Sequence, residues 1–214
     1  GYISFPRFKA PVPQTKKMVI RKRYWLYYLL QFLSGARRQI FVVFAGFMMV
    51  ERFGMDVQQL TTLYLINLIL NIALAPLLGR AVARFGERNA LAVEYFGLAV
   101  VFFAYSGIYL FGWGILIAAS LYILDHLFFA LALAIKTYFQ KIADPQDIAA
   151  TAAVAFTINH IAAIFLPVSL GFLWLKSPFL VFCTAGTLAI CSFVLALLIP
   201  REPRIGKETI FCVS

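Results

Sequence analysis

Charged residues are scarce in this chain of 214 residues: they make up 13% of it, and only nine are acidic. Apolar residues make up 63%, which is more than a soluble domain of this size can bury. A soluble globular protein is therefore excluded. The net charge of +10 does not indicate nucleic-acid binding, because the charges lie in gaps between apolar runs and not on one solvated face. We predict no nucleic-acid partner.

The chain also lacks the motifs of common enzyme and cofactor sites. It contains no glycine-rich phosphate loop, no zinc-spaced histidine set and no nucleophile elbow with its partners. The three cysteines, Cys183, Cys191 and Cys212, match neither a disulfide framework nor metal-ligand spacing. We therefore expect no enzyme activity, no metal and no cofactor. The chain begins with Gly1 and shows no signal peptide, which favours a fragment or a split half of a longer protein.

Six long apolar runs dominate the sequence, and each is long enough to cross a bilayer, for which about 20 helical residues suffice. Helix breakers and charges separate the runs. The prediction is an all-α polytopic membrane protein with a basic arm at 1–23, a six-helix transmembrane domain at 24–200 and a tail at 201–214. The runs cover approximately residues 25–50, 57–78, 89–110, 115–139, 148–173 and 178–199.

The basic residues predict how the chain is oriented. Fourteen of the nineteen fall in the arm, the loops after the second and fourth runs, and the tail. Only Arg52 and Lys176 fall in the remaining loops. Basic loops stay on the cytoplasmic side. We therefore expect both termini in the cytoplasm and the chain in the inner (plasma) membrane.

Ionisable residues inside a membrane cost several kcal/mol, so each needs a partner, water or a task. The sixth run has no charged residue, and the third has only Glu94, close to its cytoplasmic end. We expect these two helices to be lipid-facing or peripheral. At 1.5 Å of rise per residue, three other runs bring polar pairs to one depth: Arg37 and Arg38, Asp125 and His126, and Asn159 and His160.

The arginine doublet has two interpretations. In the first, Arg37 and Arg38 form the cationic floor of a midplane site for an anionic solute, with Asn159 and His160 beside it. In the second, Asp125 neutralises the arginines and the pair only fixes how the helices pack. Two arginines exceed what one carboxylate can neutralise, which favours the first interpretation and a water-filled cavity.

Asp125 with His126 is the best candidate for proton coupling, because an imidazole titrates near neutrality and lies next to a carboxyl group here. The alternative for each of them is a satisfied hydrogen bond between helices. The same alternative applies to Asn159 with His160, and to Asn67 and Asn71 in the second run. Lys136, near a helix end, is expected to extend its ammonium group to the interface.

The loop after the second run, residues 79–88, reads GRAVARFGER. It resembles the signature cytoplasmic loop of the major facilitator superfamily, in which a glycine, three variable residues and an acidic–basic pair precede a second glycine and basic residues. Ala83 stands at the acidic position and Glu87 at a basic one. The positions that fit are Gly79, Arg84, Gly86 and Arg88.

The six runs and the basic arm, which resembles the linker between the halves of such transporters, extend this resemblance over residues 24–200. It implies the C-terminal half, helices seven to twelve, with an N-terminal six-helix half supplied by the same or a separate chain. It also implies that the first and fourth helices line a central cavity, the second and fifth flank it, and the third and sixth lie outside. The loop would help to close the cytoplasmic gate, with Arg84 and Arg88 paired to helix ends or to Glu94; a simply solvated loop is the alternative.

The resulting hypothesis is the C-terminal half of a proton-coupled secondary transporter that moves a small anionic solute by alternating access. Arg37, Arg38, Asn159 and His160 would bind the solute. A rival hypothesis keeps the transporter-like fold but makes the chain a scaffold or assembly subunit without transport activity. A channel is the third.

Overall fold

The structure is a computed structural model, and it describes residues 20–211. Most of the predicted arm and the end of the tail, with Cys212, lie outside the described residues. Within residues 20–211 there is no strand beyond one isolated bridge, and six helical spans are long and apolar enough to cross a membrane. The predicted all-α membrane fold with six spans is confirmed. The spans are Lys22–Phe53, Val57–Phe85, Glu87–Phe111, Ile115–Ile142, Pro145–Lys176 and Pro178–Leu197.

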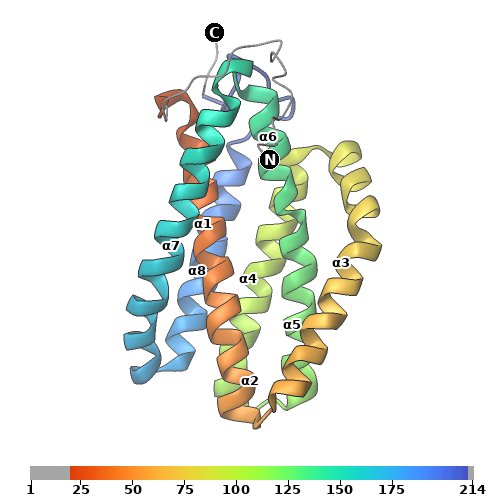
Figure 1. The fold of residues 1–214 in the computed structure, drawn as a ribbon, viewed down its shortest axis with the longest axis vertical. Coiled ribbons are helices and arrows are strands. Elements are labelled where there is room, and N and C mark those ends of the chain that lie inside the picture. Colours follow the sequence, from red (N-terminus) through yellow and green to blue (C-terminus); the bar gives the residue numbers. More distant parts are fainter. Residues whose placement is uncertain (1–19, 212–214) are drawn as a thin grey trace, which may run out of the picture.

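Three of the spans are built from more than one helical element. The elements are η1 (Lys22–Tyr24), α1 (Trp25–Ile40), the π-helical turn η2 (Phe41–Ala45) and α2 (Gly46–Phe53) in the first span; α3 (Val57–Phe85) and α4 (Glu87–Phe111) in the next two; α5 (Ile115–Phe129), η3 (Ala130–Ala132) and α6 (Leu133–Ile142) in the fourth; η4 (Pro145–Asp147) and α7 (Ile148–Lys176) in the fifth; and α8 (Pro178–Leu197) in the sixth. Successive spans run in opposite directions, and α1 begins at the same end of the molecule at which α8 ends (Figure 1).

Short local signals set the helix ends. The Asp56 side chain accepts from the Gln59 backbone N–H at 2.7 Å, and the Gln59 side chain accepts from the Asp56 backbone N–H at 3.2 Å. This capping box satisfies two backbone donors at the start of α3. Gly54, with φ 64°, ends α2 in the left-handed conformation that glycine adopts without strain.

The expected loop at 79–88 is almost entirely helical, so that part of the prediction is wrong. Gly79 and Arg84 lie in the last turns of α3, and Arg88 lies in the first turn of α4. Only Gly86 interrupts the two helices, with φ 82° and ψ 161°, a conformation that a residue with a Cβ atom avoids. The alanines and arginines of this segment are good helix formers, so one glycine is enough for the turn.

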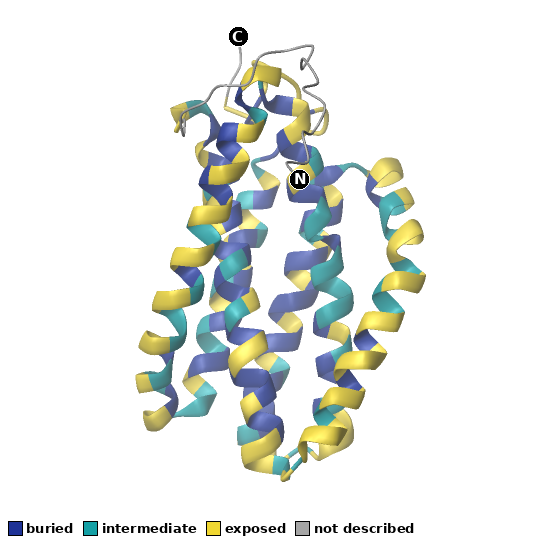
Figure 2. Ribbon diagram, in the orientation of Figure 1, coloured by how far each residue is buried: buried dark blue, intermediate teal, exposed yellow. Residues whose placement is uncertain are grey.

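Helix α4 is the most deeply buried span, which contradicts its expected peripheral position. It packs along α8 and against α5, and leaves exposed only a stripe that includes Val93, Phe96 and Val100. By contrast, α3 and α7 are the least buried spans and lie at opposite edges of the bundle (Figures 1 and 2). Both edge helices present large apolar side chains outward.

The apolar core has two parts, separated by a polar layer. On α1, one cluster ends at Leu30 and the other begins at Ile40. Between them, Gln31, Ser34 and Arg37 are buried, at the three-residue spacing of one helix face. The buried polar layer is the feature that positions the candidate site.

Ion pairs join the spans at the end where α1 begins. Arg21 pairs with Asp147, Arg23 lies 2.5 Å from Asp144, and Lys141 lies 2.6 Å from Glu87. The hydrogen bond and the charge of Asp147 raise the pKa of the Arg21 guanidinium above its ordinary value.

None of the ion pairs found within residues 20–211 includes Arg84 or Arg88. The expected pairing of these residues with Glu94 is therefore wrong, because Glu94 is fully buried and faces Arg37. The Arg84 guanidinium lies 5.6 Å from the ring of its neighbour Phe85, at the exposed end of α3.

Candidate functional site

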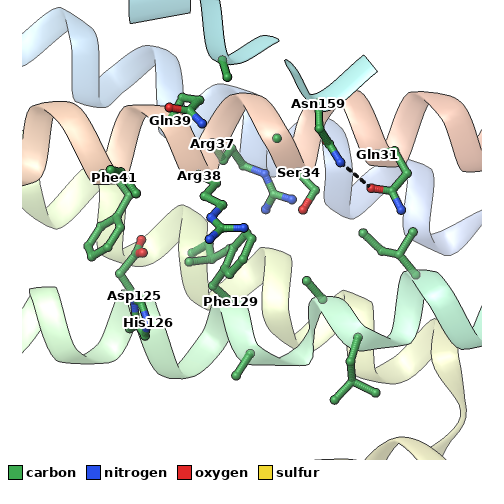
Figure 3. A pocket seen from close by; sticks show the side chains of 18 of the residues that line it. Gln31, Ser34, Arg37, Arg38, Gln39, Phe41, Asp125, His126, Phe129 and Asn159 are labelled. Carbon is green, nitrogen blue, oxygen red and sulfur yellow. Dashed lines mark hydrogen bonds between the residues drawn. The ribbon is translucent and has the colours of Figure 1, made fainter. Parts of the chain in front are cut away.

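A cavity of about 730 Å³ opens beside the polar layer, between the first and fourth spans. Side chains of α3 and α7 complete its sides, as the resemblance implies. All six polar residues singled out at one depth line this cavity, although they come from three spans. Figure 3 shows Arg37, Arg38, Asp125, His126 and Asn159. The charged and polar lining residues are Gln31, Ser34, Arg37, Arg38, Gln39, Asn71, Asp125, His126, Lys136, Asn159 and His160.

Arg37 is buried to 1% exposure, and its side chain runs back along α1. Its Nε donates to the Leu33 carbonyl at 3.2 Å, one turn earlier. The guanidinium carbon lies 4.3 Å from the Tyr95 ring centroid, within cation–π range. Its Nη2 lies 4.0 Å from Glu94 Oε1, which is an ion pair without a hydrogen bond.

Glu94 is the charged residue that the sequence interpretation placed wrongly. It is 0% exposed, and neither carboxylate oxygen has a hydrogen-bond partner. The sequence correctly predicts that Glu94 lies close to the start of α4, but it does not predict which way the side chain points. A helical arginine side chain points back toward the helix N-terminus, so the guanidinium of Arg37 reaches the depth in the membrane at which Glu94 lies. An ionisable residue within a membrane span is by default a candidate functional residue, and this rule applied to the sequence would have identified Glu94.

The finding changes the charge argument about the arginine doublet. The interpretation in which only Asp125 opposes two arginines is wrong, because Glu94 supplies a second carboxylate next to Arg37. No ion pair within 4.0 Å joins Asp125 to either arginine among the described residues. Arg37 is therefore a buried charge at the cavity wall, and Arg38 is the exposed arginine of that wall.

Arg38 is exposed and projects from α1 toward α5 (Figure 3). Its guanidinium carbon lies 5.6 Å from the Phe129 ring centroid. Lys136 also lines the cavity, and its side chain is exposed. The sequence predicted that its ammonium group extends to the membrane interface, whereas the structure places the residue in the cavity wall. The cavity wall thus carries three cationic side chains and one carboxylate, Asp125.

Asp125 is 2% exposed, and its Oδ1 has no hydrogen-bond partner. The neighbouring His126 is half-buried, with its ring 5.9 Å from Phe41 and 6.2 Å from Tyr64. Consecutive residues on a helix point about 100° apart. Asp125 therefore lies at the buried inner edge of the cavity, while His126 lies at its aromatic wall.

Asn159 and His160 have different surroundings. Asn159 Nδ2 donates to Gln31 Oε1 at 3.3 Å, which ties α7 to α1 (Figure 3). The helices approach closely here, since a Cβ atom at Gly35 would lie 2.5 Å from Asn159 Oδ1. His160 is exposed, and its Nδ1 lies 2.9 Å from the Phe156 carbonyl, so its Nε2 is the ring nitrogen left for the cavity.

The two asparagines of α3 also separate. Asn67 is buried, and its amide donates to the Tyr122 carbonyl at 3.5 Å, which joins α3 to α5. Asn71, one turn later, lines the cavity. None of the four loop residues Gly79, Arg84, Gly86 and Arg88 lines it. Within residues 20–211, no three histidine, cysteine or acidic side chains are grouped so that they could hold a metal ion.

This arrangement can attract and hold an anion. Exposed guanidinium and ammonium groups attract an anion into a cavity walled by low-dielectric protein. Neutral amides from α1 and α7 add hydrogen-bonding groups, and the aromatic side chains Phe41, Tyr64 and Phe129 suit an apolar body.

Comparison with protein families gives one match that covers more than half of the chain. The family model described as Major Facilitator Superfamily matches residues 4–167. The comparisons with curated proteins and with solved structures gave no match. The six spans, the polar cavity between the first and fourth of them, and this match agree. The chain is a multi-pass membrane transporter that belongs to the Major Facilitator Superfamily.

Proposed function

We propose that this chain is the C-terminal six-helix half of a secondary transporter that moves a small organic or inorganic anion by alternating access, coupled to protons. The observation that carries the proposal is the charge of the cavity wall, in which Arg37, Arg38 and Lys136 oppose a single carboxylate, Asp125. Because Arg37 also faces Glu94, the surplus charge resides on Arg38 and Lys136. Both are exposed to the cavity.

The exposed faces of α3 and α7 support the assignment as one half of a transporter. These spans flank the cavity and are the least buried, and their exposed residues are mostly apolar. A second six-helix half, from the same or a separate chain, would cover these faces and close the open side of the cavity. Rocking of two such halves about a midplane site is how alternating access works in transporters with internal repeats.

The orientation that we propose follows from the basic residues. Arg21, Arg23, Arg84, Lys141 and Arg201 gather at the end where α1 begins and α8 ends. Under the positive-inside rule this end is cytoplasmic, which places both ends of the transmembrane domain, 24–200, in the cytoplasm. The membrane would be the inner (plasma) membrane. The segment 1–23 would then be a cytoplasmic arm or interdomain linker, and 201–214 a cytoplasmic tail.

Asp125 with His126 is the proposed route for protons between the cavity and the protein. Asp125 is nearly fully buried yet lines the cavity, and His126 lines the same cavity as Arg38. A carboxyl and an imidazole at adjacent positions can accept protons from cavity water and release them on the other side of the membrane.

Uptake of labelled solutes into proteoliposomes tests this function. Acetate, succinate and inorganic phosphate would be compared with glycerol, an uncharged solute, under an imposed pH gradient. We expect accumulation of at least one anion and none of glycerol. Replacing Arg38 by Gln removes one charged contact to the anion, worth about 1.5–3 kcal/mol. Uptake at limiting solute concentration should therefore fall about tenfold or more.

Arg201→Gln is the matched control, because Arg201 is an exposed arginine of the tail beyond the last span and should leave uptake unchanged. Accumulation of glycerol but of no anion would contradict the proposed charge preference. Ion currents without gradient-driven accumulation would indicate a channel. A protein that takes up no solute and purifies with a stoichiometric partner would indicate a scaffold subunit instead.

A further inference from the structure

Glu94 has the least satisfied charged side chain in the described part of the chain. It is fully buried, it does not line the cavity, and both of its carboxylate oxygens lack a hydrogen-bond partner. An isolated carboxylate in such surroundings costs far more than proteins tolerate, and such groups bind a proton unless a cation balances them. The state of Glu94 therefore depends on what faces it.

Few groups face Glu94 from the elements around it. Arg37 of α1 lies 4.0 Å away, and Asp125 of α5 and Tyr95 of α4 itself interact with it electrostatically. Helix α8, which packs along α4, carries no ionisable side chain apart from Cys183 and Cys191. Arg37 is thus the cation that can balance Glu94.

The charge of Arg37 acts on two carboxyl groups, not one. It is also the cation that acts on Asp125, whose Oδ1 has no hydrogen-bond partner. Neither terminal nitrogen of the Arg37 guanidinium makes a hydrogen bond, because only its Nε is bonded, to the Leu33 carbonyl. One guanidinium with free donors therefore interacts electrostatically with carboxyl groups on two different helices.

Arg38 does not change this balance. Its guanidinium lies against Phe129 and acts on His126, on the cavity side of α5. The buried layer consequently contains one positive charge and two acidic groups. It is neutral only when one of the two carboxyls carries a proton.

We propose that Glu94 is a proton-exchange residue of this transporter and shares one proton with Asp125 under the control of Arg37. When Arg37 pairs with Glu94, Asp125 holds the proton at the cavity wall. When Arg37 turns to Asp125, the proton is held by Glu94 within the bundle. Two coupled carboxyls of this kind titrate as a pair.

The proposal rests on the proposed function for its consequence in transport. An anion that enters the cavity and draws Arg37 to itself leaves both carboxyls without a counter-charge. A second proton then enters from the cavity water, so one proton accompanies one anion. The guanidinium of Arg37 has the free donors for this exchange, since its two terminal nitrogens make no hydrogen bond within the protein.

Infrared spectroscopy of the reconstituted transporter tests the sharing directly and needs no solute. A protonated carboxyl gives a C=O stretching band that shifts in deuterated water. We expect the wild type at neutral pH to show such a band from one shared proton. Glu94→Gln and Asp125→Asn should each remove it, because the remaining carboxylate then pairs one to one with Arg37. Arg37→Gln should roughly double it, since both carboxyls are then protonated.

Glu87→Gln is the matched control. Glu87 is a buried glutamate of the same helix, 3% exposed, but it pairs with Lys141 at 2.6 Å and does not face Arg37. Its replacement should leave the band unchanged. A band that survives Glu94→Gln, or one that survives Asp125→Asn, would overturn the sharing of the proton.

The absence of any such band from the wild type would overturn the proposal even if a variant failed to fold. The spectra report protonation and not uptake. If the wild type shows the shared band but takes up no solute, the result contradicts the proposed function and not the sharing of the proton. If the wild type takes up anions but shows no such band, the result contradicts the role of Glu94 and not the proposed function.

Discussion

Replacing Gly97 by Ala tests the contact that sets the spacing between α4 and α5. A Cβ atom at Gly97 would lie 2.5 Å from Cε1 and 2.6 Å from Cδ1 and Cζ of Phe128. Phe128 packs against the larger apolar cluster and is only partly exposed. It lies three residues after Asp125, and Gly97 lies three residues after Glu94.

The magnitude follows from two opposing terms. Carbon atoms are in favourable contact at about 3.5–4.0 Å, so the ring must move by roughly 1 Å. Overpacking of this kind costs about 1–3 kcal/mol. Alanine in place of glycine stabilises a helix interior by about 1 kcal/mol at most. The difference between the two terms leaves the free energy of unfolding of Gly97→Ala lower by about 1 kcal/mol, within a range of roughly 0–2 kcal/mol.

The assay is equilibrium unfolding in detergent micelles, compared with Gly171→Ala. Gly171 lies in the interior of α7, and a Cβ atom there would meet no atom within 4 Å. This control should be as stable as the wild type or slightly more stable. If Gly97→Ala were as stable as Gly171→Ala, the close contact with Phe128 would not exist in the folded protein, and the spacing of α4 and α5 would need another cause.

Three further changes in stability are expected from the helix ends, each measured by thermal unfolding in detergent. Gly86→Ala should destabilise the protein by about 1–3 kcal/mol, because alanine is strained at the φ of 82° between α3 and α4; no loss would mean that this turn is not formed. Asp56→Ala should cost about 1 kcal/mol through loss of the capping box with Gln59, whereas Asp56→Asn should retain most of it. Lys141→Gln should destabilise more than Glu87→Gln, because the first leaves a buried carboxylate unpaired and the second leaves an exposed ammonium group; the reverse order would contradict the ion pair.

The residues around Arg37 show how far sequence reasoning reached at the site. The common depth of Arg37, Asp125 and Asn159 was predicted from 1.5 Å of rise per residue, and the structure brings all three to one cavity. Their partners were not predicted, because depth along a helix does not determine its rotation. Glu94 was therefore assigned to a lipid-facing or peripheral helix, although it lies 4.0 Å from Arg37.

The loop at Gly86 shows the same limit in the backbone. The glycines and arginines of residues 79–88 correctly marked the reversal between the second and third spans. They did not show that a single glycine suffices, because helix ends depend on hydrogen bonds and on φ and ψ, which composition predicts only to within a few residues.

The sequence by itself determined the six spans, their alternation and the clustering of basic residues at one end. Each of these depends on the apolar length of a segment and on the charges that flank it, which are local properties. Only the tertiary structure decided that α4 lies inside the bundle, that Arg37 pairs with Glu94, and that Lys136 lines the cavity. Those facts depend on how each helix is rotated against its neighbours, and in a chain so uniformly apolar the pattern of side chains leaves that rotation open.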